Sequence, residues 1–247
     1  TATKYRASRE IEMFVTAQTT KFQLLPPTDV ERYAMQSKSN RDTVAYLKRN
    51  SRIESDDKKF TTLFKEITGG LKGEPDWMKV RAIYDYVRDT IAYDGTYKGE
   101  MPKGALTTIT DGENKGDCKD MTCVFVAICR AGKIPARVVR VPNHCYGEFY
   151  LEDKQANNKT AKTSKIDKTA TKKPGKEPEG YWFPCQLAGA DEFGGITDVD
   201  PILQKGDNFP DIDDAKAHSF YVKEQFVGTG TNGIKPKFTF IHEQSGV

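Results

Sequence analysis

Residues 116–141 read GDCKDMTCVFVAICRAGKIPARVVRV, and this stretch decides the fold of the chain. Apolar residues recur at helical spacing from Met121 to Ile128, and Gly132 is placed to end that helix. The β-branched residues that follow are typical of a strand. Cys118 lies where the helix begins, so unpaired N–H groups and the helix dipole favour its thiolate. The stretch therefore predicts a helix that presents a reactive thiol.

A cysteine nucleophile needs a base. The chain has three histidines, and His144 directly follows the opening stretch on a segment that alternates like a strand, HCYGEFY. A second strand-like segment, GYWFPCQ, ends at the polar residue Gln186. His218 and His242 have no nucleophile nearby in the sequence, and we interpret them as ordinary surface or core residues. His144 is therefore the candidate base for Cys118.

A cysteine at a helix start, a histidine on a strand and a polar residue on the next strand together resemble the transglutaminase-like superfamily, a papain-related fold. Four motifs in order, over roughly residues 78–190, carry the resemblance: Gly116-Asp117-Cys118-x-Asp120, Arg130-Ala131-Gly132-x-Ile134-Pro135-Ala136-Arg137, His144-x-Tyr146-x-Glu148 and Trp182-x-Pro184. One motif alone would be a weak signal, and four in sequence are specific. The resemblance implies an α+β fold, in which N-terminal helices and the nucleophile-bearing helix pack on an antiparallel β-sheet.

The resemblance also implies a catalytic triad of Cys118, His144 and Gln186. The family usually has aspartate at the position of Gln186. A glutamine oxygen can accept the imidazole N–H, as asparagine does in papain-like enzymes. The missing negative charge predicts a weaker thiolate–imidazolium pair than in a Cys-His-Asp site. The backbone N–H of Cys118 can supply one oxyanion donor, and we identify no upstream side chain for a second.

Four charged residues of the motifs are expected to support the site without reacting. We expect Asp117 and Asp120 to cap and brace the start of the cysteine helix. We expect Arg137 and Glu148 to hold the strands in place.

The resemblance implies cysteine-dependent acyl transfer or hydrolysis at a carboxamide or peptide bond of a protein or peptide substrate. Water as acceptor would give a protease or amidase, and a lysine amine would give a cross-linking enzyme. The sequence does not choose between them, although the resemblance to bacterial-looking relatives of this family favours hydrolysis. The alternative is a non-catalytic module that binds a peptide or polymer in the inherited cleft. We expect no cofactor and no metal, because the five cysteines lack metal-ligand spacing.

Cys145 directly follows the candidate base His144, and Cys185 directly precedes the candidate third residue Gln186. If His144 and Gln186 face each other across an antiparallel pair, then Cys145 and Cys185 also face each other at about 4.5–5.5 Å between Cβ atoms. A disulfide is then geometrically conceivable. We favour two buried free thiols over that bridge.

Length and composition are compatible with one domain over residues 1–247. The chain is 37% hydrophobic and 30% charged, and it is long enough to bury a sizeable core. We place that core at about 56–190 and final strands within 218–243. No apolar run approaches the roughly 18 residues of a membrane span. The oligomeric state and the compartment stay open, and an exported protein whose leader has been removed is one alternative.

Spacing and capping signals predict further elements. We expect one or two strands within 8–25 and amphipathic helices over 56–68 and from Pro75 onward. Thr28 and Glu31 fit a capping box and predict a helix after them. A helical pattern also covers about 41–50.

A lysine-rich segment runs from Lys154 to Lys176. Eight lysines and a single acid, Asp167, give it a net charge of +7, while the whole chain carries +3. Its few apolar side chains cannot offset the entropy of ordering, so we interpret it as a solvated insertion in a hairpin. The alternative function is a tether for an anionic partner. The absence of aromatic residues, which would stack on nucleic-acid bases, favours the solvated loop.

Overall fold

A computed structural model describes residues 20–38, 41–97, 99–156, 180–197, 200–210 and 218–222. Most of the lysine-rich segment, the expected strands before residue 20 and after residue 222, and His242 lie outside the described residues. The elements in chain order are η1 Val30–Arg32, β1 Tyr33–Ala34, η2 Val44–Leu47, α1 Lys58–Thr68, η3 Gly69–Leu71, α2 Asp76–Thr90, β2 Ala92–Tyr93, α3 Ala105–Thr108, β3 Lys115–Gly116, α4 Cys118–Ala131, β4 Ala136–Val141, β5 His144–Asp153, β6 Gly180–Cys185, β7 Gln204–Lys205, β8 Phe209–Pro210 and β9 His218–Ser219.

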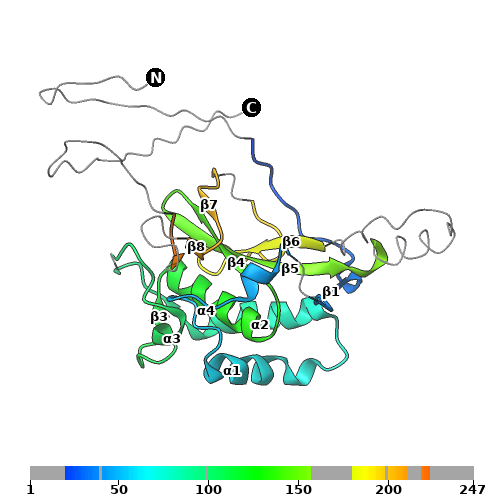
Figure 1. Ribbon diagram of the computed structural model, residues 1–247, viewed down its shortest axis with the longest axis horizontal. Coiled ribbons are helices and arrows are strands. Elements are labelled where there is room, and N and C mark those ends of the chain that lie inside the picture. The colour runs from blue at the N-terminus through cyan, green and yellow to red at the C-terminus, as the bar shows by residue number, and fades with distance from the viewer. Residues whose placement is uncertain are drawn as a thin grey trace, which may run out of the picture.

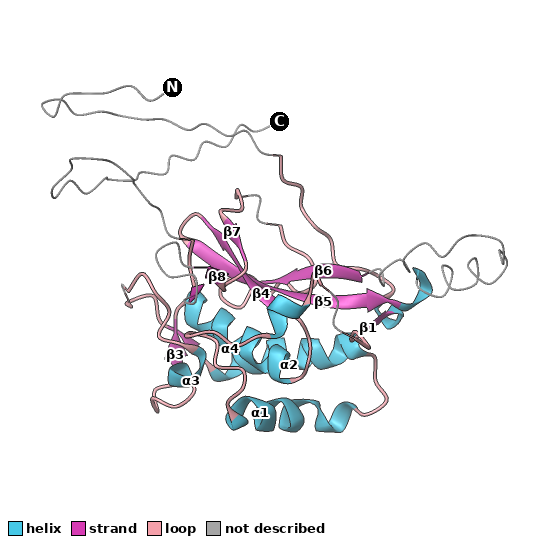
Figure 2. Ribbon diagram, in the orientation of Figure 1, coloured by secondary structure: helices cyan, strands magenta, loops and turns pink. Residues whose placement is uncertain are grey.

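The main helices lie on one side of an antiparallel sheet (Figures 1 and 2). Strand β5 is central to the sheet: it pairs with β6 along one edge and with β4 and β1 along the other, and β7 extends the sheet beyond β4. Two small sheets, β2 with β3 and β8 with β9, lie outside it. The fold is therefore α+β with the predicted layers, a cysteine-bearing helix packed on an antiparallel sheet.

Helix α4 is enclosed between the sheet and the other helices. The side chains from Cys123 to Cys129 are all fully buried, because the helix is apolar on every face. Phe125 meets Phe149 of β5, and Trp77 of α2 adds its ring to the same aromatic cluster. This packing fixes the start of α4 relative to β5, and so it fixes Cys118 relative to His144.

The predicted amphipathic helices correspond to α1 and α2, but two other helix predictions are wrong. The segment after Thr28 forms only the 3-10 turn η1, whose N-cap residue makes no side-chain cap, and it then enters β1. Tyr33 pairs with Asp153 of β5, so tertiary pairing overrides the local capping signal. The pattern at 41–50 is reduced to the four-residue 3-10 helix η2.

The Arg-Ala-Gly stretch of the second motif is explained by two contacts at the end of α4. Gly132 leaves room for the ring of Phe64 on α1, since a Cβ at this position would lie 2.1 Å from a ring carbon. Arg130 is buried and forms an ion pair with Asp207 at 2.7 Å. Its guanidinium also donates to the carbonyl oxygens of Lys48 and Ala136.

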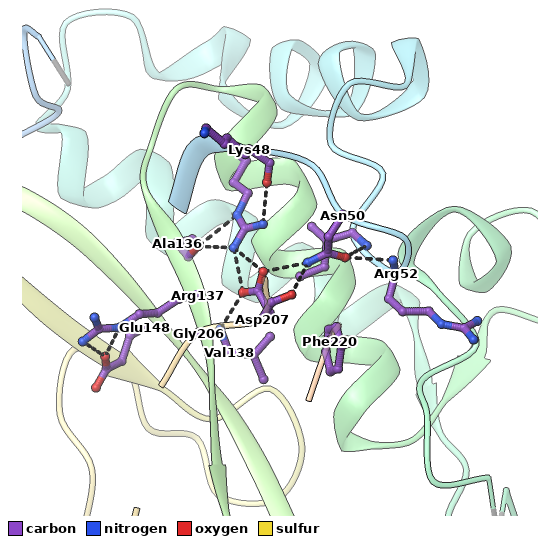
Figure 3. Close-up of polar contacts among 12 residues, drawn as sticks. Lys48, Asn50, Arg52, Ala136, Arg137, Val138, Glu148, Gly206, Asp207 and Phe220 are labelled. Carbon is purple, nitrogen blue, oxygen red and sulfur yellow. Dashed lines mark hydrogen bonds and ion pairs between the residues drawn. The ribbon is translucent and has the colours of Figure 1, made fainter. Parts of the chain in front are cut away.

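Asp207 is the centre of a buried polar network (Figure 3). Its carboxylate accepts from Arg130, from the side chain of Asn50 at 2.7 Å and from the backbone N–H of Val138 at 3.3 Å. Asn50 in turn accepts from the backbone N–H groups of Arg52 and Ile53. The network thus joins the end of α4, strand β4 and two connecting segments.

Arg137 and Glu148 hold β4 to β5, as predicted. They are directly opposite each other and form an ion pair at 2.6 Å. Lys205 of β7 adds a second cation to Glu148 at 3.1 Å, and the Arg137 guanidinium lies 3.9 Å from the ring centroid of Trp182 on β6. One cluster therefore connects four strands of the sheet.

Across the described residues, no helix has the length and apolar character needed to cross a membrane.

Candidate active site

The Gly-Asp-Cys-x-Asp motif builds the start of α4 by a reciprocal capping box. Asp117 is the N-cap residue and accepts the backbone N–H groups of Lys119 at 2.8 Å and Asp120 at 3.2 Å. Asp120 accepts the N–H of Asp117 at 3.3 Å and that of Lys103 at 2.7 Å. Gly116 makes room for this arrangement, because a Cβ there would lie 2.6 Å from the Cβ of Asp120. The motif therefore fixes Cys118 as the first residue of the helix. Both aspartates cap and brace this helix start, as predicted.

The structure brings the three predicted site residues together. His144 is the first residue of β5, and Gln186 directly follows β6. The His144 Nε2 lies 2.8 Å from the Gln186 Oε1. An amide oxygen can only accept, so Nε2 carries the proton and Nδ1 is the nitrogen left for the thiol of Cys118. A side-chain hydrogen bond links His144 to Cys118 and completes the chain of three groups.

The pKa of the Cys118 thiol is lowered to about 4. The largest cause is a hydrogen bond from the side chain of Cys145, and the hydrogen bond and charge of His144 add to it. These effects outweigh the burial of the thiol, which favours its neutral form. The site therefore holds Cys118 as a thiolate over the neutral pH range.

The pairing of β5 with β6 differs by two residues from the register in which His144 and Gln186 are opposite. Gly147 is opposite Cys185, and the two site residues meet because their side chains bridge the ends of the strands. The expected opposition of Cys145 and Cys185 is therefore wrong. All five cysteines are free, and the Cys185 thiol lies 3.6 Å from the carbonyl oxygen of Gly147.

Arg88 on α2 holds the loop that carries Gln186. Its guanidinium donates to the carbonyl oxygens of Gln186 at 3.0 Å, Ala190 at 3.1 Å and Gly189 at 3.1 Å. The backbone N–H of Gln186 donates to Glu192 across the same loop at 2.8 Å. The loop is thus tied both to itself and to α2. No motif pointed to Arg88, because its partners lie about one hundred residues downstream and are backbone atoms.

We expect Arg88→Met to loosen Gln186 and, through it, His144. Three hydrogen bonds from a charged group are lost, so the free energy of unfolding should fall by about 1–2 kcal/mol. The apparent pKa of Cys118, measured from the pH dependence of alkylation, should rise. Lys79→Met on the same helix is the control, since Lys79 bonds only to Asp76 among the described side chains. A loss of stability with an unchanged pH profile would show that Arg88 supports the fold without positioning the site.

Two tyrosines that the sequence did not single out lie close to the site. The pairing of β2 with β3 places Tyr93 opposite Gly116, with 63% of Tyr93 exposed. Tyr221 packs under the guanidinium of Arg140, 4.7 Å from the ring centroid. Burial is the main cause that raises the pKa of Tyr221, and the nearby Cys145 contributes.

No cluster of potential metal ligands occurs among the described residues.

Residues 61–157 match the sequence model of the transglutaminase-like superfamily. This part of the chain is similar to that superfamily. The match begins within α1 and ends after β5, so it includes Cys118 and His144 and excludes Gln186. The match includes three of the four motifs, and it confirms the resemblance and the transglutaminase-like α+β fold class.

Comparison with solved structures finds a candidate cysteine protease from Cytophaga hutchinsonii. It is 27% identical, and the alignment covers 46% of this chain and 39% of that chain with a TM-score of 0.39. The chain thus spans well under half of that protein's length. A comparison with curated proteins found no match.

Proposed function

We propose that Cys118, His144 and Gln186 catalyse acyl transfer at a carboxamide or peptide bond, with water as the main acceptor. The observation that supports this most directly is the hydrogen-bonded chain from the lowered-pKa thiol through the imidazole to the glutamine oxygen. A thiol with a raised pKa and no base nearby would not support covalent catalysis. The transglutaminase-like match, which includes Cys118 and His144, agrees with a cysteine-dependent site.

The first half of the reaction uses the thiolate and the imidazolium. Cys118 attacks the carbonyl carbon, and the backbone N–H of Cys118 is placed to bind the oxygen that becomes negative. His144 then gives its Nδ1 proton to the nitrogen of the leaving amine, the C–N bond breaks, and a thioester remains on Cys118.

The second half returns the site to its starting state. His144, now neutral, takes a proton from the acceptor, and the acceptor oxygen or nitrogen attacks the thioester carbonyl. Cys118 leaves as the thiolate. Gln186 keeps Nε2 protonated throughout, so Nδ1 is always the nitrogen that exchanges protons with the reacting groups.

Trapping of the acyl-enzyme tests this proposal. We expect p-nitrophenyl acetate to release a burst of about one equivalent of nitrophenol and to acetylate Cys118. Trypsin cleaves after Lys115 and Lys119, so Cys118 falls alone in peptide 116–119, apart from Cys123 and Cys129. Cys118→Ala should abolish the burst, and Cys123→Ala, a change at a buried thiol of the same helix, should keep it.

Products from a glutamine-rich protein substrate then identify the bond and the acceptor. Peptide fragments would indicate a protease and ammonia an amidase, and incorporation of an added primary amine would indicate cross-linking. A wild-type protein that shows no burst, and whose acetylation is spread over its thiols, would contradict catalysis. A non-catalytic module that binds a peptide would then be the better interpretation of this fold.

A further inference from the structure

We propose that Cys145 is the resolving cysteine for Cys118, so that a hydroperoxide converts the two thiols into a reversible disulfide that closes the site. This inference requires only the two neighbouring sulfurs and does not depend on the acyl-transfer reaction.

The two sulfurs are held side by side by elements that pack rigidly on each other. Cys145, the second residue of β5, makes a side-chain hydrogen bond and a backbone hydrogen bond to the thiol of Cys118 at the start of α4. The Cys145 Sγ also lies 3.9 Å from the Thr122 Oγ1. Thr122 is one helical turn beyond Cys118, and its hydroxyl donates to the Cys118 carbonyl oxygen at 2.7 Å. Contacts with both residues place the Cys145 sulfur on the side of α4 that carries Cys118.

Access and charge give the two thiols different roles. Cys118 is partly exposed and is a thiolate, whereas Cys145 is 3% exposed. A dissolved hydroperoxide therefore reaches and oxidises Cys118 first, because the thiolate is the reactive form. Cys123, Cys129 and Cys185 are buried, and burial raises the pKa of each of them, so they are poor competitors.

The chemistry balances with a hydroperoxide as the only added reactant. The Cys118 thiolate attacks the outer oxygen, the O–O bond breaks, and the departing alkoxide or hydroxide takes a proton from water. Cys118 is now a sulfenic acid, two electrons more oxidised. The Cys145 sulfur then attacks the Cys118 sulfur, an S–S bond forms, and the sulfenic oxygen leaves with the Cys145 proton as water.

Oxidation of Cys118 itself prepares Cys145 for the second step. The largest cause that raises the pKa of Cys145 is its hydrogen bond to the Cys118 thiolate. A sulfenic acid carries no such charge, so that effect disappears when Cys118 is oxidised.

Mass spectrometry of the oxidised protein tests the pair directly. The native protein is treated with a small excess of hydrogen peroxide, alkylated and digested with trypsin. Cys118 lies in peptide 116–119 and Cys145 in peptide 141–154, while Cys123 and Cys129 share peptide 120–130. We expect a disulfide between the first two peptides, a fall from five to three free thiols, and recovery of both thiols with dithiothreitol.

Cys145→Ser is the decisive variant, and Cys129→Ala is its matched control. Serine keeps the size and the hydrogen bond of Cys145 but cannot form the bridge, so Cys118 should accumulate as sulfinic acid that dithiothreitol does not recover. Cys129→Ala should still form the bridge. Sulfinic acid on Cys118 of the wild type without any cross-linked peptide would overturn the proposal, as would a bridge that uses another cysteine. These readouts do not use activity, so they stand even if the acyl-transfer proposal fails.

Discussion

Replacement of Asp207 by alanine is expected to lower the free energy of unfolding by about 3–5 kcal/mol, because it leaves the buried Arg130 guanidinium without its counterion. Both side chains are almost completely buried, with 0% of Arg130 and 1% of Asp207 exposed in the ion pair. The Val138 N–H also loses its contact with the carboxylate, whereas the Asn50 side chain keeps the backbone carbonyl oxygen of residue 207 as an acceptor. The unpaired buried charge and the buried backbone donor that loses this contact each add to the cost.

Chemical denaturation with urea measures this loss, and two further variants separate its causes. Asp56→Ala removes an exposed ion pair with Arg49, so it should change stability by less than about 1 kcal/mol. The double variant Arg130→Met with Asp207→Leu removes both charges, and it should recover much of the stability lost in Asp207→Ala. A loss below about 1 kcal/mol in Asp207→Ala would mean that the network of Figure 3 is not a major support of the fold.

The Arg130–Asp207 network also shows what sequence reasoning could not reach. Arg130 lies in a recognisable motif, but its partner follows 77 residues later in a loop with no pattern of its own. In contrast, helices α1, α2 and α4 were predicted correctly, because their apolar residues recur at helical spacing within a short segment. The capping box of Asp117 and Asp120 is likewise a local signal. Local signals therefore predicted these helices, whereas contacts between residues far apart in the sequence were found only in the structure.

The candidate site also combines features that the sequence predicted with contacts that only the structure shows. The motifs predicted that Cys118, His144 and Gln186 would lie together, and the structure brings them together, while their catalytic roles stay predictions. The register between β5 and β6 could not be derived, since His144 and Gln186 meet beyond the paired residues. The neighbourhood of Cys145 was misjudged for this reason: its partner is the nucleophile on α4 and not Cys185.

Where local signals were weak, tertiary pairing decided the outcome. Thr28 and Glu31 carry a valid capping pattern, yet β1 pairs with the end of β5 and ends the 3-10 turn after three residues. A short helix has little intrinsic stability in water, so a strand pairing overrides it easily.

The second large effect is expected from His144→Ala, which should slow the alkylation of Cys118 at pH 6 by tenfold or more. In the wild type the pKa of Cys118 is lowered to about 4, so the thiol is almost entirely thiolate at this pH. A thiol with the ordinary pKa of about 8.5 would be thiolate in only roughly 0.3% of molecules at pH 6, which sets an upper limit of roughly 300-fold. The hydrogen bond from Cys145 survives the change, so the loss should stay below that limit.

The measurement is the rate of iodoacetamide labelling of peptide 116–119 between pH 4 and pH 9. Because alkylation needs the thiolate, the lowered pKa of Cys118 keeps the labelling rate high down to acidic pH. The labelling rate of the variant should therefore fall first at low pH. The other groups that act on this thiol are Lys119, which pairs with Asp117 at 2.5 Å, and the buried Cys145; the substitution leaves both in place. His218→Ala, at an exposed histidine in β9, is the control and should leave the profile unchanged.

Gln186→Glu extends the argument to the third residue. Glutamate has the same length as glutamine, so its carboxylate can occupy the position of the amide oxygen that lies 2.8 Å from Nε2. A carboxylate there would stabilise the imidazolium more than the neutral amide does, and the imidazolium in turn stabilises the thiolate. The fast range of alkylation should therefore reach further toward acid in this variant than in the wild type. An identical profile in wild type, His144→Ala and Gln186→Glu would mean that Cys145 and the helix start alone hold the thiolate, and the base of the proposed reaction would have to be sought elsewhere.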